Sequence, residues 1–204
     1  MKNIEVESRG PLSKEKFLEL DKIFREKGKF KESKNRILIA YSIFLPGQSI
    51  DNRTKDIRLR VTNGMPEIIV KIGRWGASES RKEISIFAHK GDFDSLVEAF
   101  GVMGFEKGML CVRNTEVYEY KDVEFSLVEV PNHSYYFEAE KLLDANQDRE
   151  IAKQEIAEAC EELKLDVFDD KSFFAYIRKL NKEVNEVFEF KNYTKNYFKN
   201  RFNL

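Results

Sequence analysis

Cysteine, histidine and long apolar runs are all scarce in this 204-residue sequence. Its two cysteines, Cys111 and Cys160, do not belong to a CxxC or CxxH arrangement. A disulfide framework and a structural zinc site both need clustered ligands, so we expect neither. The two histidines, His89 and His133, have no second ligand at a suitable spacing, so we interpret both as surface residues.

An excess of charge of either sign is also missing. The sequence holds 35 lysines and arginines against 36 aspartates and glutamates, a formal net charge of -1. A balanced chain has no general attraction to nucleic acid or to an anionic membrane, so we expect neither as a partner. No apolar run approaches the about 20 residues of a membrane helix, and the charged N-terminus does not resemble a secretory signal. We therefore expect a cytoplasmic protein in which any charged site is local.

The C-terminal segment 191–204 interleaves lysine and arginine with aromatic residues. That pattern occurs in proteins that stack single-stranded nucleic acid, but a stretch of this length is not specific. We interpret it as a final helix or strand that packs its aromatic side chains on the body of the protein.

Alternation of apolar and polar residues is what the sequence has in abundance. This period of two predicts about eight antiparallel strands separated by turn residues. The alternating segments are residues 4–10, 37–44, 56–61, 67–72, 80–87, 108–120, 123–130 and 134–143. Helical periodicity follows Ser13 as far as Gly28, recurs over about 92–103, and returns from residue 147 to Val187. We expect a single α+β domain, 1–204, with a β-rich body (1–144) and a helical C-terminal extension (145–204).

Charged residues share one face of several predicted strands. In the first strand Glu5, Glu7 and Arg9 point to the same side, because successive side chains of a strand alternate. The other strands carry these charges on one face: Arg58, Arg60, Lys71, Arg81, Glu83, Arg113, Glu138 and Glu140. Carboxylates therefore gather on the first and last strands, and most of the bases on the strands between them.

The first and last strands become neighbours if the sheet closes into a barrel. Glu5 and Glu7 would then approach Glu138 and Glu140. Four crowded carboxylates repel each other unless a cation lies between them, and oxygen ligands suit Mg²⁺ or Mn²⁺. The facing arginines would bind a polyanion, because a guanidinium matches a phosphate bidentately. The same residues also allow a simpler interpretation, in which this polar face is only hydrated.

Five short motifs, in this order, resemble those of the CYTH superfamily, the triphosphate tunnel metalloenzymes. They are E-x-E-x-R at 5–9, R-x-R at 58–60, a strand ending in Lys71, R-x-E at 81–83, and E-x-E at 138–140. The chain departs from the family pattern at a few positions. Arg9 stands where the family has a lysine, and Ser85 stands where it has a second glutamate. The family also has an acidic residue near the position of Val128. Cys111 stands where the family pattern has the lysine of a K-x-R pair.

The resemblance implies an eight-stranded antiparallel β-barrel that forms a polar tunnel, with helices packed outside. It also implies that Glu5, Glu7, Glu138 and Glu140 hold Mg²⁺ or Mn²⁺. The phosphates of a small-molecule triphosphate would be bound by Arg58, Arg60, Lys71, Arg81 and Arg113. Arg9 and Glu83 would act in catalysis, Arg9 by stabilising negative charge and Glu83 by orienting the arginines or the water. A homodimer is a further expectation that the family raises.

Three functions are compatible with these residues. The first is metal-dependent hydrolysis of a triphosphate, either inorganic tripolyphosphate or a small organic triphosphate. The second is class IV adenylyl cyclase activity, which needs a purine pocket that no sequence feature establishes. The third is non-catalytic binding of polyphosphate or nucleotide, which the changes at Ser85, Cys111 and Val128 favour.

Overall fold

The computed structural model describes residues 4–144 and 146–204. Its elements, in chain order, are β1 (Ile4–Leu12), α1 (Lys14–Lys27), β2 (Lys29–Ala40), η1 (Ser42–Phe44), β3 (Lys55–Thr62), β4 (Met65–Ile72), β5 (Ser78–Phe87), α2 (Phe93–Val102), β6 (Lys107–Tyr120), β7 (Val123–Val130), β8 (Ser134–Leu143), α3 (Arg149–Glu162), α4 (Asp170–Glu183), β9 (Glu186–Glu189), η2 (Phe190–Asn192) and α5 (Tyr197–Phe202). Residue 145, where the predicted boundary between body and extension falls, lies outside the described residues.

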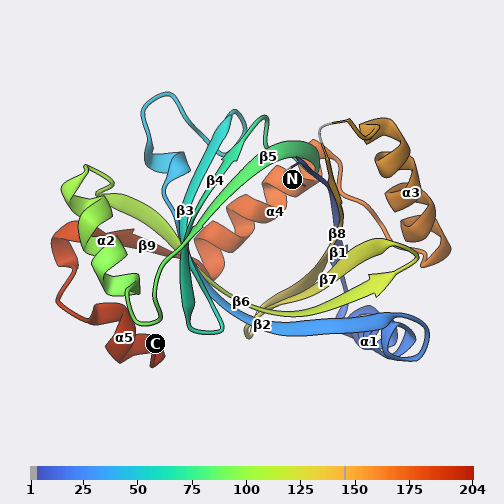
Figure 1. Cartoon of the computed structure of the whole chain (residues 1–204), viewed down its shortest axis with the longest axis horizontal. Helices are drawn as coiled ribbons and strands as arrows, with labels where there is room; N and C mark the ends of the chain where they lie inside the picture. The colour runs from blue at the N-terminus through green and yellow to red at the C-terminus, as the bar shows by residue number, and fades with distance from the viewer. Residues whose placement is uncertain (1–3, 145) are drawn as a thin grey trace.

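Eight strands close into an antiparallel barrel, as predicted (Figure 1). Their order around the barrel is β2-β3-β4-β5-β1-β8-β7-β6, and β6 pairs back with β2. The expected contact between β1 and β8 is present, with a register that runs from Ile4 opposite Leu143 to Leu12 opposite Tyr135. Two segments far apart in the sequence therefore form one continuous wall.

Several boundaries differ from the sequence-based expectation. Strand β2 begins at Lys29, eight residues before the predicted segment 37–44. The strand predicted over 37–44 ends at Ala40, and residues 42–44 form the short helix η1; the Ser42 hydroxyl there accepts a hydrogen bond of 2.6 Å from the Ile57 amide. The last helix ends at Glu183, and Val187 belongs instead to β9. Val187 lies opposite Met109, so pairing with the start of β6 overrides the helical period.

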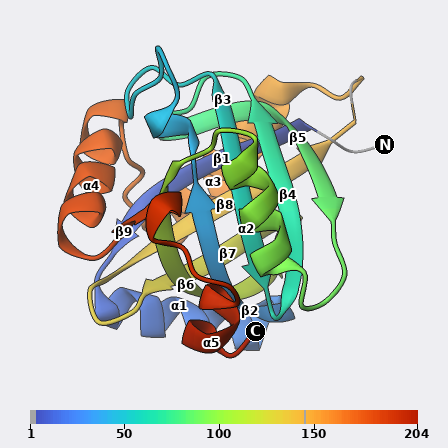
Figure 2. The ribbon, with the colours of Figure 1, turned by 90° about the vertical axis from the view of Figure 1, so that its left-hand side faces the viewer.

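The apolar core lies between the barrel and its helices rather than inside the barrel. Phe24 of α1 and Ile156 of α3 are buried against the outer faces of β6, β7 and β8. On another side, α2 and α5 cover β2 and β3 (Figure 2). Phe198 of α5 is fully buried there, so the prediction that segment 191–204 packs on the body is confirmed.

Helix α4 lies across one end of the barrel, the far end in Figure 1. Its N-terminal residue Asp170 accepts a hydrogen bond from the Ala77 amide at 3.0 Å and forms an ion pair with Arg74 at 2.6 Å. Its C-terminal residue Glu183 lies 3.0 Å from the Nε2 atom of His133. His89 is exposed as expected. His133 is partly buried, with its side chain 16% exposed, and it links the turn before β8 to the end of α4.

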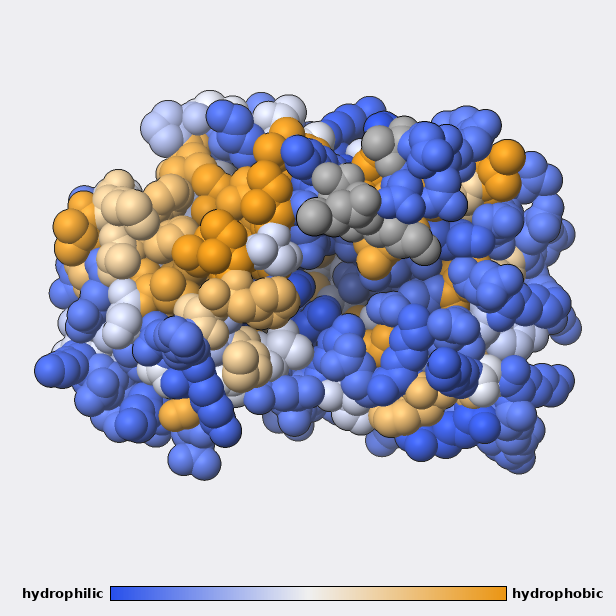
Figure 3. Space-filling model, viewed as in Figure 1, coloured by the Kyte–Doolittle hydropathy of each residue, from blue (hydrophilic) through white to orange (hydrophobic). Residues whose placement is uncertain are grey.

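Part of the outer face of β4 and β5 is apolar and exposed. Ile72, Ile84 and Ile86 are 47%, 40% and 58% exposed, and Figure 3 shows hydrophobic colour over this part of the molecule. The homodimer that the family resemblance raised stays a prediction.

Gly10 is where the connection between α3 and α4 crosses β1. A Cβ atom at Gly10 would lie 1.9 Å from the Asp166 carbonyl oxygen and 2.5 Å from the Phe137 ring. The neighbouring amide of Phe168 donates to the Arg9 carbonyl at 2.8 Å, so the connection cannot retreat without losing that bond. We expect Gly10→Ala to lower the free energy of unfolding by about 1–3 kcal/mol, the usual effect of an additional methyl group in a closely packed place.

Urea unfolding followed by circular dichroism measures this loss. Ser8→Ala, on the same strand, is the control and should change the free energy of unfolding by less than about 0.5 kcal/mol. Equal stability of the Gly10→Ala variant and the parent would contradict the close crossing.

Candidate metal and phosphate site in the tunnel

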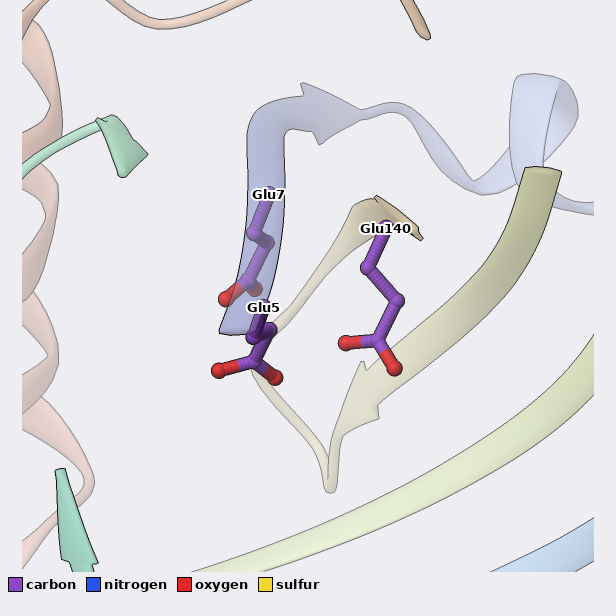
Figure 4. Close-up of side chains that lie close together, drawn as sticks. All are labelled: Glu5, Glu7 and Glu140. Atoms are coloured by element: carbon purple, nitrogen blue, oxygen red, sulfur yellow. The ribbon is translucent and has the colours of Figure 1, made fainter. Parts of the chain in front are cut away.

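Three carboxylates from two paired strands meet inside the barrel. Glu5 and Glu7 come from β1, and Glu140 from β8 lies opposite Glu7 in the register. One oxygen of each lies within 4.8 Å of the others, and Figure 4 shows the three side chains pointing toward one another. Glu5 and Glu7 are buried, and burial together with the Glu5 carboxylate holds the pKa of Glu140 well above its usual range.

The donor set of this trio fits a hard divalent cation. It offers only carboxylate oxygens, the ligand type that Mg²⁺ and Mn²⁺ prefer. Burying three like charges together is unfavourable unless a positive charge compensates them. Within residues 4–144 and 146–204, this is the one group of three or more acidic, histidine or cysteine side chains close enough to share an ion.

The fourth predicted metal ligand, Glu138, stands outside the trio. It lies opposite Arg9 in the register, and its carboxylate is 3.4 Å from the Arg9 Nε atom. Burial alone would raise the pKa of Glu138, but Arg9 and Arg36 lower it below its usual value. Arg9 also pairs with Glu7 and donates to the Gly76 carbonyl at 2.9 Å. Arg9 therefore links the two acidic strands to the loop before β5.

Lys71 of β4 connects the trio to Glu83 of β5. Its ammonium contacts Glu5 and lies 3.1 Å from Glu83. Burial opposes its charge, yet Glu5, Glu7 and Glu83 together raise the pKa of Lys71. Burial would likewise raise the pKa of Glu83, but Lys71 and Arg60 lower it to about 2. Ser85, which stands where the family has a glutamate, donates a hydrogen bond of 2.9 Å to the Glu83 carboxylate. Glu83 is thus held in place by Ser85 and can in turn position Lys71 through their ion pair.

Two of the predicted phosphate-binding arginines converge on an acid that the motifs did not indicate. Asp56 is fully buried and pairs with Arg58, with Arg81 at 3.3 Å and with Arg53 at 3.7 Å. Burial would raise the pKa of Asp56, but Arg58 and Arg53 hold it far below its usual range. Asp56 lies two residues before Arg58 in the same strand, so the alternation rule alone could have placed it in the tunnel.

The remaining predicted clamp residues also line the tunnel. Arg60 Nε donates to Glu67 at 2.6 Å. Arg113 donates to the Asn185 side-chain oxygen at 3.0 Å, which ties β6 to the residue just beyond α4. Four of the five predicted phosphate-binding residues thus line one cavity, namely Arg58, Arg60, Lys71 and Arg113. The fifth, Arg81, is buried beside Asp56 behind the cavity lining.

Arg36 on β2 is a tunnel residue that the sequence interpretation missed. It lies opposite Arg113 in the β2–β6 register and lines the same cavity. Its Nε atom is buried without a hydrogen-bond partner, and the described chain provides no carboxylate within 4.0 Å of its guanidinium. Burial, and then the neighbouring charge of Arg60, lowers the pKa of Arg36. Arg36, Leu38 and Ala40 are two residues apart in β2 and therefore share its inner face. This period of two is the sequence signal that could have indicated Arg36 as a tunnel residue.

The cavity enclosed by these side chains has a volume of about 550 Å³. Figure 3 shows a recess with hydrophilic residues around it at the open end of the barrel. At the α4 end, Trp75 is buried between the Arg53 guanidinium, 3.4 Å from the ring centroid, and the ring of Phe173 at 4.8 Å. Trp75 therefore caps the tunnel at this end.

In the part of the chain that the structure describes, no helix has both the length and the apolar character needed to cross a bilayer. No protein-family model and no curated protein sequence matches the chain.

Solved structures do resemble it. PH1819 from Pyrococcus horikoshii superposes with a TM-score of 0.68 at 22% identity, over 86% of this chain and 98% of that one. A candidate adenylate cyclase from Vibrio parahaemolyticus gives a TM-score of 0.58 at 14% identity, over 81% and 91%. A candidate adenylyl cyclase from Hippeastrum, described as having a dominant triphosphatase activity, gives 0.51 at 11% identity, over 85% and 95%.

These likenesses extend over most of each chain, and they agree with the closed barrel and with the motifs on its inner face. At such low identity they bear on the fold alone. The chain shares the closed antiparallel barrel of these structures, which is the fold that its resemblance to the CYTH superfamily implied.

Proposed function

We propose that this protein binds a triphosphate in its tunnel and hydrolyses a phosphoanhydride bond with the help of a divalent cation. The observation that carries the proposal is the division of one enclosed cavity into an acidic and a basic wall. The acidic wall is the trio Glu5, Glu7 and Glu140. The basic wall consists of Arg36, Arg58, Arg60, Lys71 and Arg113. A triphosphate-cation complex has the complementary charge distribution.

The basic residues would bind the phosphate oxygens and offset the negative charge that grows on the leaving group. Glu83 and Asp56 would position Lys71, Arg58 and Arg81, since they already hold these cations by ion pairs. Arg9 would act by its fixed charge, because a guanidinium does not give up a proton at neutral pH. A Mg²⁺ or Mn²⁺ ion, held by the trio with or without Glu138, would supply electrostatic stabilisation and lower the pKa of bound water.

The proposal is tested by incubating the protein separately with tripolyphosphate and with ATP, in the presence of Mg²⁺ or Mn²⁺. Release of orthophosphate from tripolyphosphate supports hydrolysis. Cyclic AMP and diphosphate from ATP would instead identify a cyclase and overturn the preference for hydrolysis.

A second candidate function is non-catalytic binding of a triphosphate. It is favoured by Glu83, whose pKa of about 2 makes it a weak base at neutral pH. Tight binding of tripolyphosphate without turnover in Mg²⁺, Mn²⁺ or Co²⁺ would support this candidate over the enzyme.

Arg36 provides a separate test of the basic wall. A charge-assisted hydrogen bond contributes about 1.5–3 kcal/mol, so Arg36→Gln should weaken tripolyphosphate binding by roughly 10- to 150-fold. The ligand-free variant should be no less stable than the parent, because Arg36 has no ion pair to lose. Titration calorimetry and urea unfolding measure the two effects.

Lys55→Gln, on the exposed side of β3, is the matched control and should bind tripolyphosphate like the parent. Unchanged affinity in the Arg36→Gln variant would show that the anion does not reach β2.

A further inference from the structure

Arg113 is held in the tunnel in a different way from most of the basic wall. Arg58, Arg60 and Lys71 each form an ion pair with a carboxylate. Arg113 is buried as well, but in the part of the chain that the structure describes no ion pair joins it to an acid. Arg36, its partner in the β2–β6 register, shares this property. Burying a charge without a counterion is unfavourable, so this part of the wall is arranged for an anion that enters from outside.

The hydrogen bonds of Arg113 lead to the end of α4. Its Nη1 atom donates to the Val112 carbonyl at 2.7 Å, its Nη2 atom donates to the Asn185 side-chain oxygen at 3.0 Å, and the neutral phenol of Tyr136 adjoins it. A guanidinium only donates hydrogen bonds, so the Asn185 amide must turn its oxygen toward Arg113 and its nitrogen away. That nitrogen donates to the Asn181 side-chain oxygen at 2.8 Å. The two amides therefore form a relay with one fixed direction.

The backbone of Asn185 is fixed on both sides. Its amide donates to the Leu180 carbonyl at 2.8 Å, and the Leu180 side chain is buried under the last turn of α4. Strand β9 begins directly after Asn185 and pairs with β6, where Phe188 lies opposite Gly108. Asn185 is thus set in place by two regular elements before any ligand binds, which is what an orienting group requires.

A neutral acceptor and a carboxylate affect a buried cation differently. A carboxylate orients the cation but cancels much of its charge at the distance of a ligand, whereas an amide oxygen orients it and leaves the net charge in place. Both Asn185 and Arg113 line the tunnel cavity, so a bound anion would experience this difference.

We propose that Asn185, supported by Asn181, is a positioning residue for phosphate binding: it orients the Arg113 guanidinium through a neutral acceptor, so that Arg113 keeps its full charge for the anion. This inference rests on the proposed function, since it takes Arg113 to be a phosphate ligand. It assigns a role to the junction between α4 and β9 that no charged motif indicates.

The first test is Asn185→Ala, with tripolyphosphate affinity measured by titration calorimetry in EDTA to prevent turnover. Loss of one orienting hydrogen bond should weaken binding by roughly 3- to 10-fold. The same change made in an Arg113→Gln background should alter the affinity by less than about twofold, because the group to be oriented is gone. Asn200→Ala, at an exposed position of α5, is the control and should bind like the parent.

The second test is Asn185→Asp, which replaces the neutral acceptor by a charged one of the same shape. The new carboxylate should pair with Arg113, so the free energy of unfolding in urea should stay equal or rise. Tripolyphosphate affinity should nevertheless fall by at least about tenfold, since the charge of Arg113 is then compensated. A purely structural asparagine would not give these opposite signs. Asn200→Asp adds the same charge on the outside and should change neither quantity.

The outcomes separate the two proposals. Parent-like affinity in both Asn185 variants would overturn this inference alone, as would an equal loss from Asn185→Ala with and without Arg113. If Asn185→Ala does not fold, the paired stability and affinity of Asn185→Asp decide the question. Absence of tripolyphosphate binding by the parent, in EDTA and with Mn²⁺, would overturn the proposed function and this inference with it.

Discussion

Glutamine in place of Glu140 is expected to reduce triphosphate turnover by at least about 100-fold, while leaving the cation-free protein at least as stable as the parent. Glu140 shares the buried trio with Glu5 and Glu7, and repulsion from Glu5 contributes to its raised pKa. An amide at position 140 removes one of these like charges and can still donate a hydrogen bond to Glu5. The same change takes away a negatively charged ligand, so a divalent cation is held less tightly.

Thermal unfolding with EDTA and with Mn²⁺ separates these effects. The parent should gain melting temperature when Mn²⁺ is added, because an ion that binds only the folded state stabilises it. Glu140→Gln should lose most of that gain, and its orthophosphate release from tripolyphosphate should fall in parallel. Glu155→Gln, at a surface ion pair with Lys141, is the control. Full turnover with an unchanged Mn²⁺ response would remove Glu140 from the cation site.

Alanine in place of Asp56 is expected to cause the largest loss of stability in the tunnel wall, about 3–5 kcal/mol. Asp56 is fully buried and pairs with Arg53, Arg58 and Arg81. Its removal leaves three buried guanidinium groups without their shared counterion. Because Arg58 is also a proposed phosphate ligand, its loss of position should weaken tripolyphosphate binding in any variant that still folds.

Asp51→Ala is the matched control for Asp56→Ala. Asp51 also pairs with an arginine, Arg178, but its side chain is 52% exposed, so this pair contributes about 1 kcal/mol or less. Urea unfolding at pH 7 should separate the two variants clearly. A small loss in both would mean that Asp56 is not the counterion of the arginine cluster.

The pH dependence of the Asp56 contribution follows from the direction of its pKa shift. The folded-state pKa of Asp56 lies far below the ordinary value of an aspartate. The stabilisation by Asp56 is therefore fully present above the unfolded-state pKa and is lost only as pH falls toward the folded-state pKa. The difference in free energy of unfolding between parent and Asp56→Ala should stay constant from pH 7 down to about pH 5, and narrow below about pH 4. A difference that narrows between pH 7 and pH 5 would contradict the assigned direction.

The inner-face residues were predictable because side-chain alternation is a local property of a strand. Glu5, Glu7 and Arg9 share a face whatever β1 pairs with, and the same holds for Arg58 and Arg60 of β3. The rule applied equally to Arg36 and Asp56, but these residues belong to no motif and were therefore overlooked. Helix α4 was also predictable from its apolar period, whereas its position across the barrel end was not.

By itself, the sequence determined the strands, the two faces of each strand and the set of charges that enter the tunnel. Only the tertiary structure decided which of these charges meet. The register of β1 and β8 sets Glu7 opposite Glu140 and Glu138 opposite Arg9, which makes a trio of carboxylates rather than a group of four. A shift of two residues would keep every side chain on its face and yet exchange its partner. Register depends on hydrogen bonds between segments that are far apart in the chain, so no local pattern encodes it.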